Sequence, residues 1–77
     1  MLKGYVLVRL VPGFESAAIS HISVVPGVKD IILVFGRWDA LVQIEAKTLS
    51  ELSRLVLSQI RGIQGVQATE TLVAAEA

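Results

Sequence analysis

The chain has 77 residues, of which 53% are hydrophobic and 18% are charged, and its mean hydropathy is +0.67. Seven basic residues balance seven acidic ones without any basic cluster. This excludes the charged surface that phosphate-backbone binding requires, so we expect no direct contact with nucleic acid. Cysteine is absent, which excludes disulfides, thiolate metal sites and cysteine nucleophiles.

The apolar content is high for a domain of this size. A chain of about 60 residues buries only about 60% of its unfolded surface on folding, and exposed apolar patches usually mark interaction sites. We therefore expect one domain over residues 1–77 that assembles with copies of itself. The longest apolar run, residues 31–35, is far shorter than the roughly 20 residues of a membrane helix. No signal peptide is evident, so we expect a cytoplasmic protein without a membrane partner.

The first half of the chain predicts a strand, a helix and a second strand. Residues 2–11 alternate between apolar and polar faces as a strand does, which places Tyr5 and Leu7 together on one face. Apolar residues at helical spacing predict a helix over residues 14–23. Residues 28–35 have the composition of a second strand.

The second half repeats the order of strand, helix and strand. Residues 39–46 predict a third strand, which the short turn Gly36-Arg37-Trp38 joins to the second one. Thr48 and Glu51 have the spacing of a capping box, so a second helix is expected to begin there. Its apolar stripe comprises Leu49, Leu52, Val56, Ile60 and Ile63. Residues 66–73 predict the last strand.

The resulting order, β-α-β-β-α-β, predicts a ferredoxin-like α+β fold, with a four-stranded antiparallel sheet and both helices on one face. The two halves resemble each other at a separation of 38 residues, which suggests an internal duplication. The other face of the sheet is left uncovered, and burial against a second copy would suit its apolar character. Unbroken alternation places on this face Tyr5, Leu7, Arg9, Ile31, Leu33, Phe35, Leu41, Gln43, Glu45, Thr69, Thr71 and Val73.

No pattern predicts a catalytic, metal or cofactor site. His21 is the only histidine and has no companion that would make it a general base, and the carboxylates are scattered. The glycines form no phosphate-binding string.

Two short stretches keep two interpretations each. The run Gly36-Arg37-Trp38-Asp39 is either an ordinary hairpin turn or a tip that binds something polar through Asp39 while Trp38 contacts a neighbouring subunit. Thr69 and Thr71 are either ordinary strand residues or two adjacent hydroxyls for a zwitterionic ligand.

The runs VFGRWDALV at residues 34–42 and IQGVQATET at residues 63–71, with Pro-Gly-Val upstream, resemble the effector-binding (RAM) domain of Lrp/AsnC transcriptional regulators. The resemblance implies a non-enzymatic domain that dimerises through its sheets and forms rings of dimers, with an amino acid bound between dimers. It also implies that Gly36 and Asp39 line the ligand pocket, with Thr69 and Thr71 nearby. We expect the oligomer contacts to include Trp38, Leu33, Tyr5 and Leu7.

Two departures from the family pattern bear on function. A threonine is common where Phe35 stands and a tyrosine where Trp38 stands, which affects the expected ligand preference. The chain begins with Met1 directly before the first strand and so resembles stand-alone members without a helix-turn-helix domain. Regulation would then act through a partner, such as a full-length Lrp/AsnC regulator.

The alternative function is a small dimeric ferredoxin-like enzyme of the α+β-barrel monooxygenase type.

Overall fold

A four-stranded antiparallel sheet covered on one face by helices makes up residues 1–75, the part of the chain that the computed structural model describes. The elements in chain order are β1 (Leu2–Leu10), α1 (Glu15–Ser23), β2 (Val28–Leu33), β3 (Ala40–Ala46), α2 (Leu49–Leu55), the π-helical turn η1 (Val56–Ile60) and β4 (Val66–Val73). The strand order across the sheet is β2-β3-β1-β4. This is the ferredoxin-like arrangement, and the predicted fold class is confirmed.

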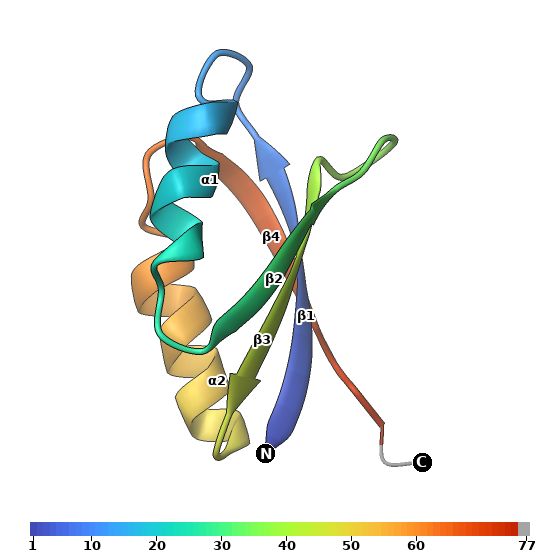
Figure 1. The fold of residues 1–77 in the computed structure, drawn as a ribbon, viewed down its shortest axis with the longest axis vertical. Helices are drawn as coiled ribbons and strands as arrows, with labels where there is room; N and C mark the ends of the chain where they lie inside the picture. Colours follow the sequence, from blue (N-terminus) through green and yellow to red (C-terminus); the bar gives the residue numbers. More distant parts are fainter. Residues whose placement is uncertain (76–77) are drawn as a thin grey trace.

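The helices lie together on one side of the sheet, as Figure 1 shows, and none of the elements within residues 1–75 covers the opposite face. The edge strands β2 and β4 lie at the front and the back of that view. The connection between β2 and β3 projects from the upper end of the sheet. No helix within residues 1–75 has the length and apolar character to cross a membrane.

The core lies between the helices and the two central strands. Alternate residues of β1 and β3 point into it, because successive side chains of a strand face opposite sides. Ala18 and Ile22 of α1 and Leu52 of α2 pack against them. The buried side chains are Val6, Val8, Leu10, Ala18, Ile22, Val25, Ala40, Val42, Ile44, Ala46, Leu52, Val56 and Ile60.

The second helix begins with the predicted cap and ends in a wider turn. The Thr48 hydroxyl accepts a hydrogen bond from the Glu51 amide at 3.1 Å. At the other end, the Arg61 amide donates to the Val56 carbonyl at 2.9 Å, the five-residue spacing of a π-helix. The apolar stripe predicted for this helix faces the core except at Leu49. Leu49 is the first residue of the helix, and its side chain is exposed.

A β-bulge in each edge strand overturns part of the predicted sheet register. In β2 the pairing with β3 shifts between Val28 and Asp30, so Lys29 is an extra residue. In β4 the extra residue is Gln67, opposite the shift between Arg9 and Leu10. One extra residue exchanges the faces of all side chains that follow it in the strand.

The predictions for the ends of both edge strands are therefore wrong. Leu33 pairs with Ala40, whose side chain is buried in the core, so Leu33 lies on the helix side of the sheet. The same correction applies to Ile31, Thr69, Thr71 and Val73. Their partners are Val42, Val8, Val6 and Gly4, which lie at positions of β1 and β3 that face the helices. These four residues therefore also lie on the helix side of the sheet. The predicted faces of Tyr5, Leu7, Arg9, Leu41, Gln43 and Glu45 are confirmed by the alternating burial of β1 and β3.

The bulges extend the internal similarity of the two halves. Lys29 and Gln67 are 38 residues apart, and so are Gly27 and Gly65, which precede the two strands. Both glycines have positive φ, of 93° and 101°. A Cβ atom on Gly27 would lie 2.6 Å from the Glu45 carbonyl, so the close approach of two backbones also requires glycine there. The two halves thus share their turn and their bulge as well as their element order.

Candidate functional site

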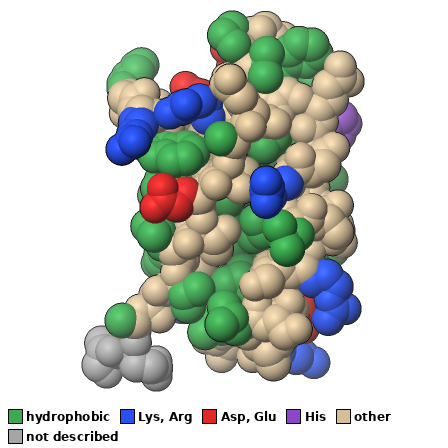
Figure 2. All heavy atoms as spheres, turned by 180° about the vertical axis from the view of Figure 1, so that it is seen from behind, with side chains coloured by type: hydrophobic (Ala, Val, Ile, Leu, Met, Phe, Trp, Pro, Cys, Tyr) green, Lys and Arg blue, Asp and Glu red, His purple; other side chains and the backbone are tan. Residues whose placement is uncertain are grey.

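The connection between β2 and β3, residues 34–39, is longer than the three-residue turn predicted and is called here the tip loop. The Val34 amide donates to the Asp39 carbonyl at 3.0 Å and closes it. Gly36, with φ of 113°, makes its reversal. Phe35 is fully exposed. Figure 2 shows the tip loop projecting at the upper left, with a hydrophobic side chain at its end and basic side chains below.

Arg9 ties the tip loop to the sheet. Its Nε and Nη2 atoms donate to the Arg37 carbonyl at 3.2 and 3.0 Å. The guanidinium also lies 5.3 Å from the centre of the Trp38 ring, within range of a cation–π interaction. Trp38 therefore has a partner within its own chain, and its contact with another subunit stays a prediction.

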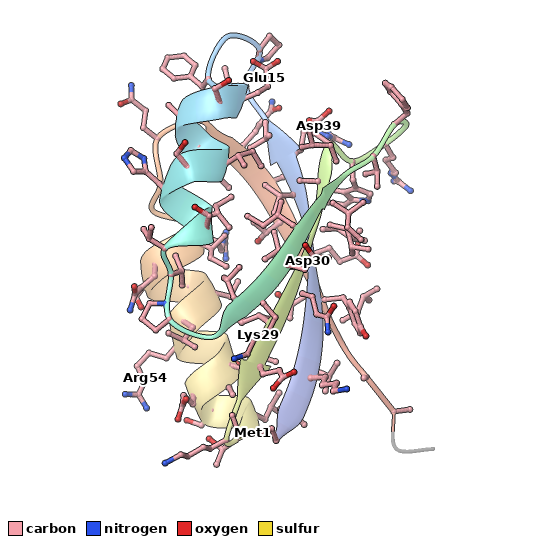
Figure 3. All side chains as sticks on the ribbon, in the orientation of Figure 1. Met1, Glu15, Lys29, Asp30, Asp39 and Arg54 are labelled. Carbon is pink, nitrogen blue, oxygen red and sulfur yellow. The ribbon has the colours of Figure 1, made fainter. Side chains whose placement is uncertain are left out.

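Asp39 also has a structural role in the single chain. Pairing of β1 with β3 ends at Val8 and Ala40, so the Leu10 amide has no partner on β3. The Asp39 carboxylate accepts from this amide through Oδ2 at 2.7 Å. Figure 3 shows Asp39 at the base of the tip loop, beside the end of β1. Sequence reasoning missed this contact, because the two residues are 29 positions apart.

Thr69 and Thr71 lie in a different place, which we call the threonine hollow. It is a surface depression of about 230 Å³ between β4 and the second helix. The residues that line it are Ser53, Val56, Leu57, Arg61, Thr69 and Thr71. None of them belongs to the tip loop, so a single chain does not bring Gly36 and Asp39 together with the two threonines.

The uncovered face of the sheet is the other candidate surface, and we call it the open sheet face. Tyr5, Leu7 and Leu41 form its centre and are half-buried. The bulges bring Ile32 and Leu72 to its two edges, opposite Leu41 and Tyr5, and these side chains are 50% and 48% exposed. Sequence reasoning missed both residues because it assumed unbroken alternation in the edge strands.

Residues 1–75, which the structure describes, contain no group of three or more His, Cys, Asp or Glu side chains that could hold a metal ion. The candidate surfaces offer hydroxyls, the Arg61 guanidinium, the tip-loop backbone and apolar side chains. This chemistry suits the recognition of a small polar molecule and of other protein surfaces.

Comparison with known families and proteins agrees with this assignment. The family model described as the Lrp/AsnC ligand binding domain matches residues 3–77. An uncharacterized HTH-type transcriptional regulator of Pyrococcus horikoshii is 35% identical over 72 residues, which cover 90% of this chain and 48% of the regulator. A homocitrate synthase of Sulfurisphaera tokodaii is 38% identical over 58 residues, which cover 75% of this chain and 12% of the synthase. The chain thus spans about half the length of the regulator and a small part of the synthase.

Solved structures share the fold. The protein TTHA0845 from Thermus thermophilus has a TM-score of 0.93 and 31% sequence identity, over 100% of this chain and 96% of its own. A transcriptional regulator of Neisseria meningitidis, solved as a complex with L-Met, has a TM-score of 0.81 at 19% identity, over 97% of this chain and 50% of its own. At that identity the second likeness concerns the fold alone.

Proposed function

Because the chain belongs to the Lrp/AsnC family as a ligand-binding domain, we propose that it is a non-enzymatic module that binds an amino acid and assembles from dimers into rings. It would work as one domain over residues 1–77. The observation that carries the proposal is the match of the family's ligand-binding domain to nearly the entire chain.

The two kinds of relatives support an effector-binding role. The matched segment occurs in a helix-turn-helix regulator and in a synthase, and in each it is only part of the protein. Only the regulator needs a DNA-binding domain, and only the synthase needs a catalytic domain. A segment that both proteins share is therefore expected to have neither of these functions. Binding of a regulatory ligand is a function that both could use. This also favours the binding module over the monooxygenase alternative.

An amino acid is the class of ligand that we propose. The regulator of Neisseria meningitidis that shares this fold was solved with L-Met, which supports this class for the fold. The residues proposed for the ligand are Gly36 and Asp39 of the tip loop together with Thr69 and Thr71. Because one chain keeps these two pairs apart, a ligand that contacts both pairs would lie between two copies.

The open sheet face is the proposed dimer interface. Tyr5, Leu7 and Leu41 offer a central apolar surface, and Ile32 and Leu72 widen it at both edges. A two-fold arrangement would pack this surface against its own copy, with apolar residues at the centre and charged residues at the rim. Leu33 is no longer expected to contribute, since it lies on the helix side. In the ring, Trp38 and the exposed Phe35 would contact a neighbouring dimer.

The partners that follow are copies of this chain and a full-length Lrp/AsnC regulator with which it could co-assemble. Direct binding to DNA is not proposed, because seven basic residues are balanced by seven acidic ones. A regulator subunit in the same ring would supply the contact with DNA.

Thermal unfolding in the presence of each of the twenty amino acids tests the proposal. A ligand at a hundred times its dissociation constant should stabilise the folded protein by about 2.7 kcal/mol. We expect one amino acid, or a chemically related few, to raise the melting temperature while the others leave it unchanged. If none of them stabilises the protein at millimolar concentration, the proposed function is wrong.

A further inference from the structure

The threonine hollow presents hydrogen-bond donors that the chain itself does not use. Three hydroxyls and one guanidinium line it, from Ser53, Thr69, Thr71 and Arg61. None of the side-chain hydrogen bonds found among residues 1–75 involves these four groups. The Arg9 guanidinium, by contrast, donates its hydrogen bonds to the tip loop. The donors of the hollow are therefore free for a ligand.

The positions of these residues follow from the helix and from the bulge. Ser53, Leu57 and Arg61 are four residues apart and form one stripe along α2 and η1, beside the buried stripe of Leu52 and Val56. The bulge at Gln67 turns Thr69 and Thr71 toward that stripe. A π-helical turn beside the hollow is a further indication, because such turns occur frequently at functional sites.

The internal duplication provides a comparison within the molecule. A second hollow of about 310 Å³ lies between α1 and β2, lined by Glu15, Ser16, Ile19, Ser20 and Leu33. At the separation of 38 residues, Ser53 corresponds to Glu15, Leu57 to Ile19 and Thr71 to Leu33. Thr69 and Arg61 correspond to Ile31 and Ser23.

The two hollows share an aliphatic wall and differ in their polar groups. Leu57 and Ile19 are both aliphatic, whereas the strand contributes Thr69 and Thr71 to one hollow and Leu33 to the other. Ile31, the counterpart of Thr69, also has no hydroxyl. The fold therefore does not require hydroxyls at these strand positions. Within residues 1–75, the charged residue that lines the hollow between α1 and β2 is the acid Glu15, whereas the one that lines the threonine hollow is the cation Arg61. Ser16 and Ser20 give the hollow of the first half helix hydroxyls, but the strand hydroxyls and the guanidinium occur only in the threonine hollow.

We infer that the threonine hollow binds the carboxylate of a small aliphatic acid, with Arg61 and the two threonines on the carboxylate and Leu57 against the aliphatic chain. This inference rests on the proposed function and specifies one part of its ligand. Guanidinium and hydroxyl donors match a carboxylate, and a guanidinium can hold both oxygens. The volume of about 230 Å³ lies below the roughly 300–1,000 Å³ of ligand pockets, so only a small molecule fits. Among the residues that the structure describes, no carboxylate lines the hollow to bind an ammonium group.

Three probes separate the groups that the hollow recognises. L-Valine has the carboxylate, the ammonium and a branched chain, α-ketoisovalerate lacks the ammonium, and isobutylamine lacks the carboxylate. We expect both carboxylates to bind and to shift the backbone amide NMR signals of Ser53, Thr69 and Thr71, and we expect isobutylamine to do neither. Binding of isobutylamine as tight as that of L-valine would overturn the inference, and so would signals of these residues that neither carboxylate moves.

Two matched variants test Arg61. Arg61→Gln removes the charge from an exposed side chain and keeps the backbone amide that closes η1. We expect this substitution to weaken the binding of L-valine and of α-ketoisovalerate about ten- to a hundredfold, which is the effect of losing a hydrogen bond to a charged group. Arg54→Gln is the control, because Arg54 is exposed on the same helix and points away from the sheet (Figure 3). Binding that is the same in wild type and Arg61→Gln would overturn the inference.

The outcome also distinguishes this inference from the proposed function. If an amino acid stabilises the protein but Arg61→Gln binds it normally, the inference fails and the proposed function stands. If none of the twenty amino acids stabilises the protein while α-ketoisovalerate binds in an Arg61-dependent way, the proposed function fails and the inference stands.

Discussion

At the scale of single residues, the tip loop shows how one position can serve both the fold and a site. Asp39 is proposed to contact a ligand, yet its Oδ2 already accepts a hydrogen bond from the Leu10 amide. Trp38 is proposed to contact a neighbouring dimer, yet Arg9 lies over its ring. Both side chains are only half-buried, so each keeps exposed atoms that could take these roles. A substitution at either position therefore changes the chain itself as well as any ligand or neighbour.

Asp39→Ala should lower the free energy of unfolding by about 1–3 kcal/mol, because it leaves the part-buried Leu10 amide without an acceptor. Asp39→Asn keeps an oxygen at that position and should cost less. Urea unfolding at one fixed protein concentration measures both, since the stability of an oligomer depends on concentration. An Asp39→Ala protein as stable as the wild type would show that the contact with Leu10 is unimportant.

At the scale of elements, the sequence predicts which helices and strands exist better than it predicts their faces. The N-cap at Thr48 and the alternation of β1 and β3 are local patterns, and the structure confirms them. The return bond from the Glu51 carboxylate that would complete a capping box is not found among residues 1–75. The bulges at Lys29 and Gln67 leave no local pattern, because each is only one extra residue opposite a partner strand. A bulge depends on pairing between strands far apart in sequence, which one strand's composition does not reveal.

The same reason explains what was missed in the candidate site. Arg9 and Leu10 hold the tip loop from 28 and 29 residues away, and no spacing rule connects such positions. The sequence singles out Thr69 and Thr71 but predicts them on the uncovered face, so it does not predict the threonine hollow. The four-residue spacing of Ser53, Leu57 and Arg61 was a usable signal once that face was known.

The bulge in β2 leads to a prediction about two neighbouring residues. Ile32→Glu would place a charge on the open sheet face, where burial in the proposed dimer would leave it unpaired, so the dimer should dissociate. Leu33→Glu should leave the dimer intact, because Leu33 is 68% exposed on the helix side. Sedimentation equilibrium distinguishes the two. The opposite result, with Leu33→Glu alone dissociating, would contradict both the register and the interface.

At the scale of the whole molecule, the composition and the fold lead to the same conclusion. The chain is 53% hydrophobic, and its helices cover only one face of the sheet. Ile32, Leu72 and Phe35 remain exposed in the single chain, on the open sheet face and at the tip loop. Surfaces of this kind are typical of proteins that bury them against partners. Assembly and ligand binding are then expected to depend on each other, because the proposed ligand residues meet only between copies.

Sedimentation equilibrium of the wild-type protein, alone and with the amino acid that most raises its melting temperature, tests this coupling most directly. The proposed function predicts a dimer or larger species at micromolar concentration in both cases. It also predicts that the amino acid changes the balance between dimers and larger assemblies, since a ligand that binds between copies favours one assembly over another. A stable monomer whose mass no amino acid changes would contradict it.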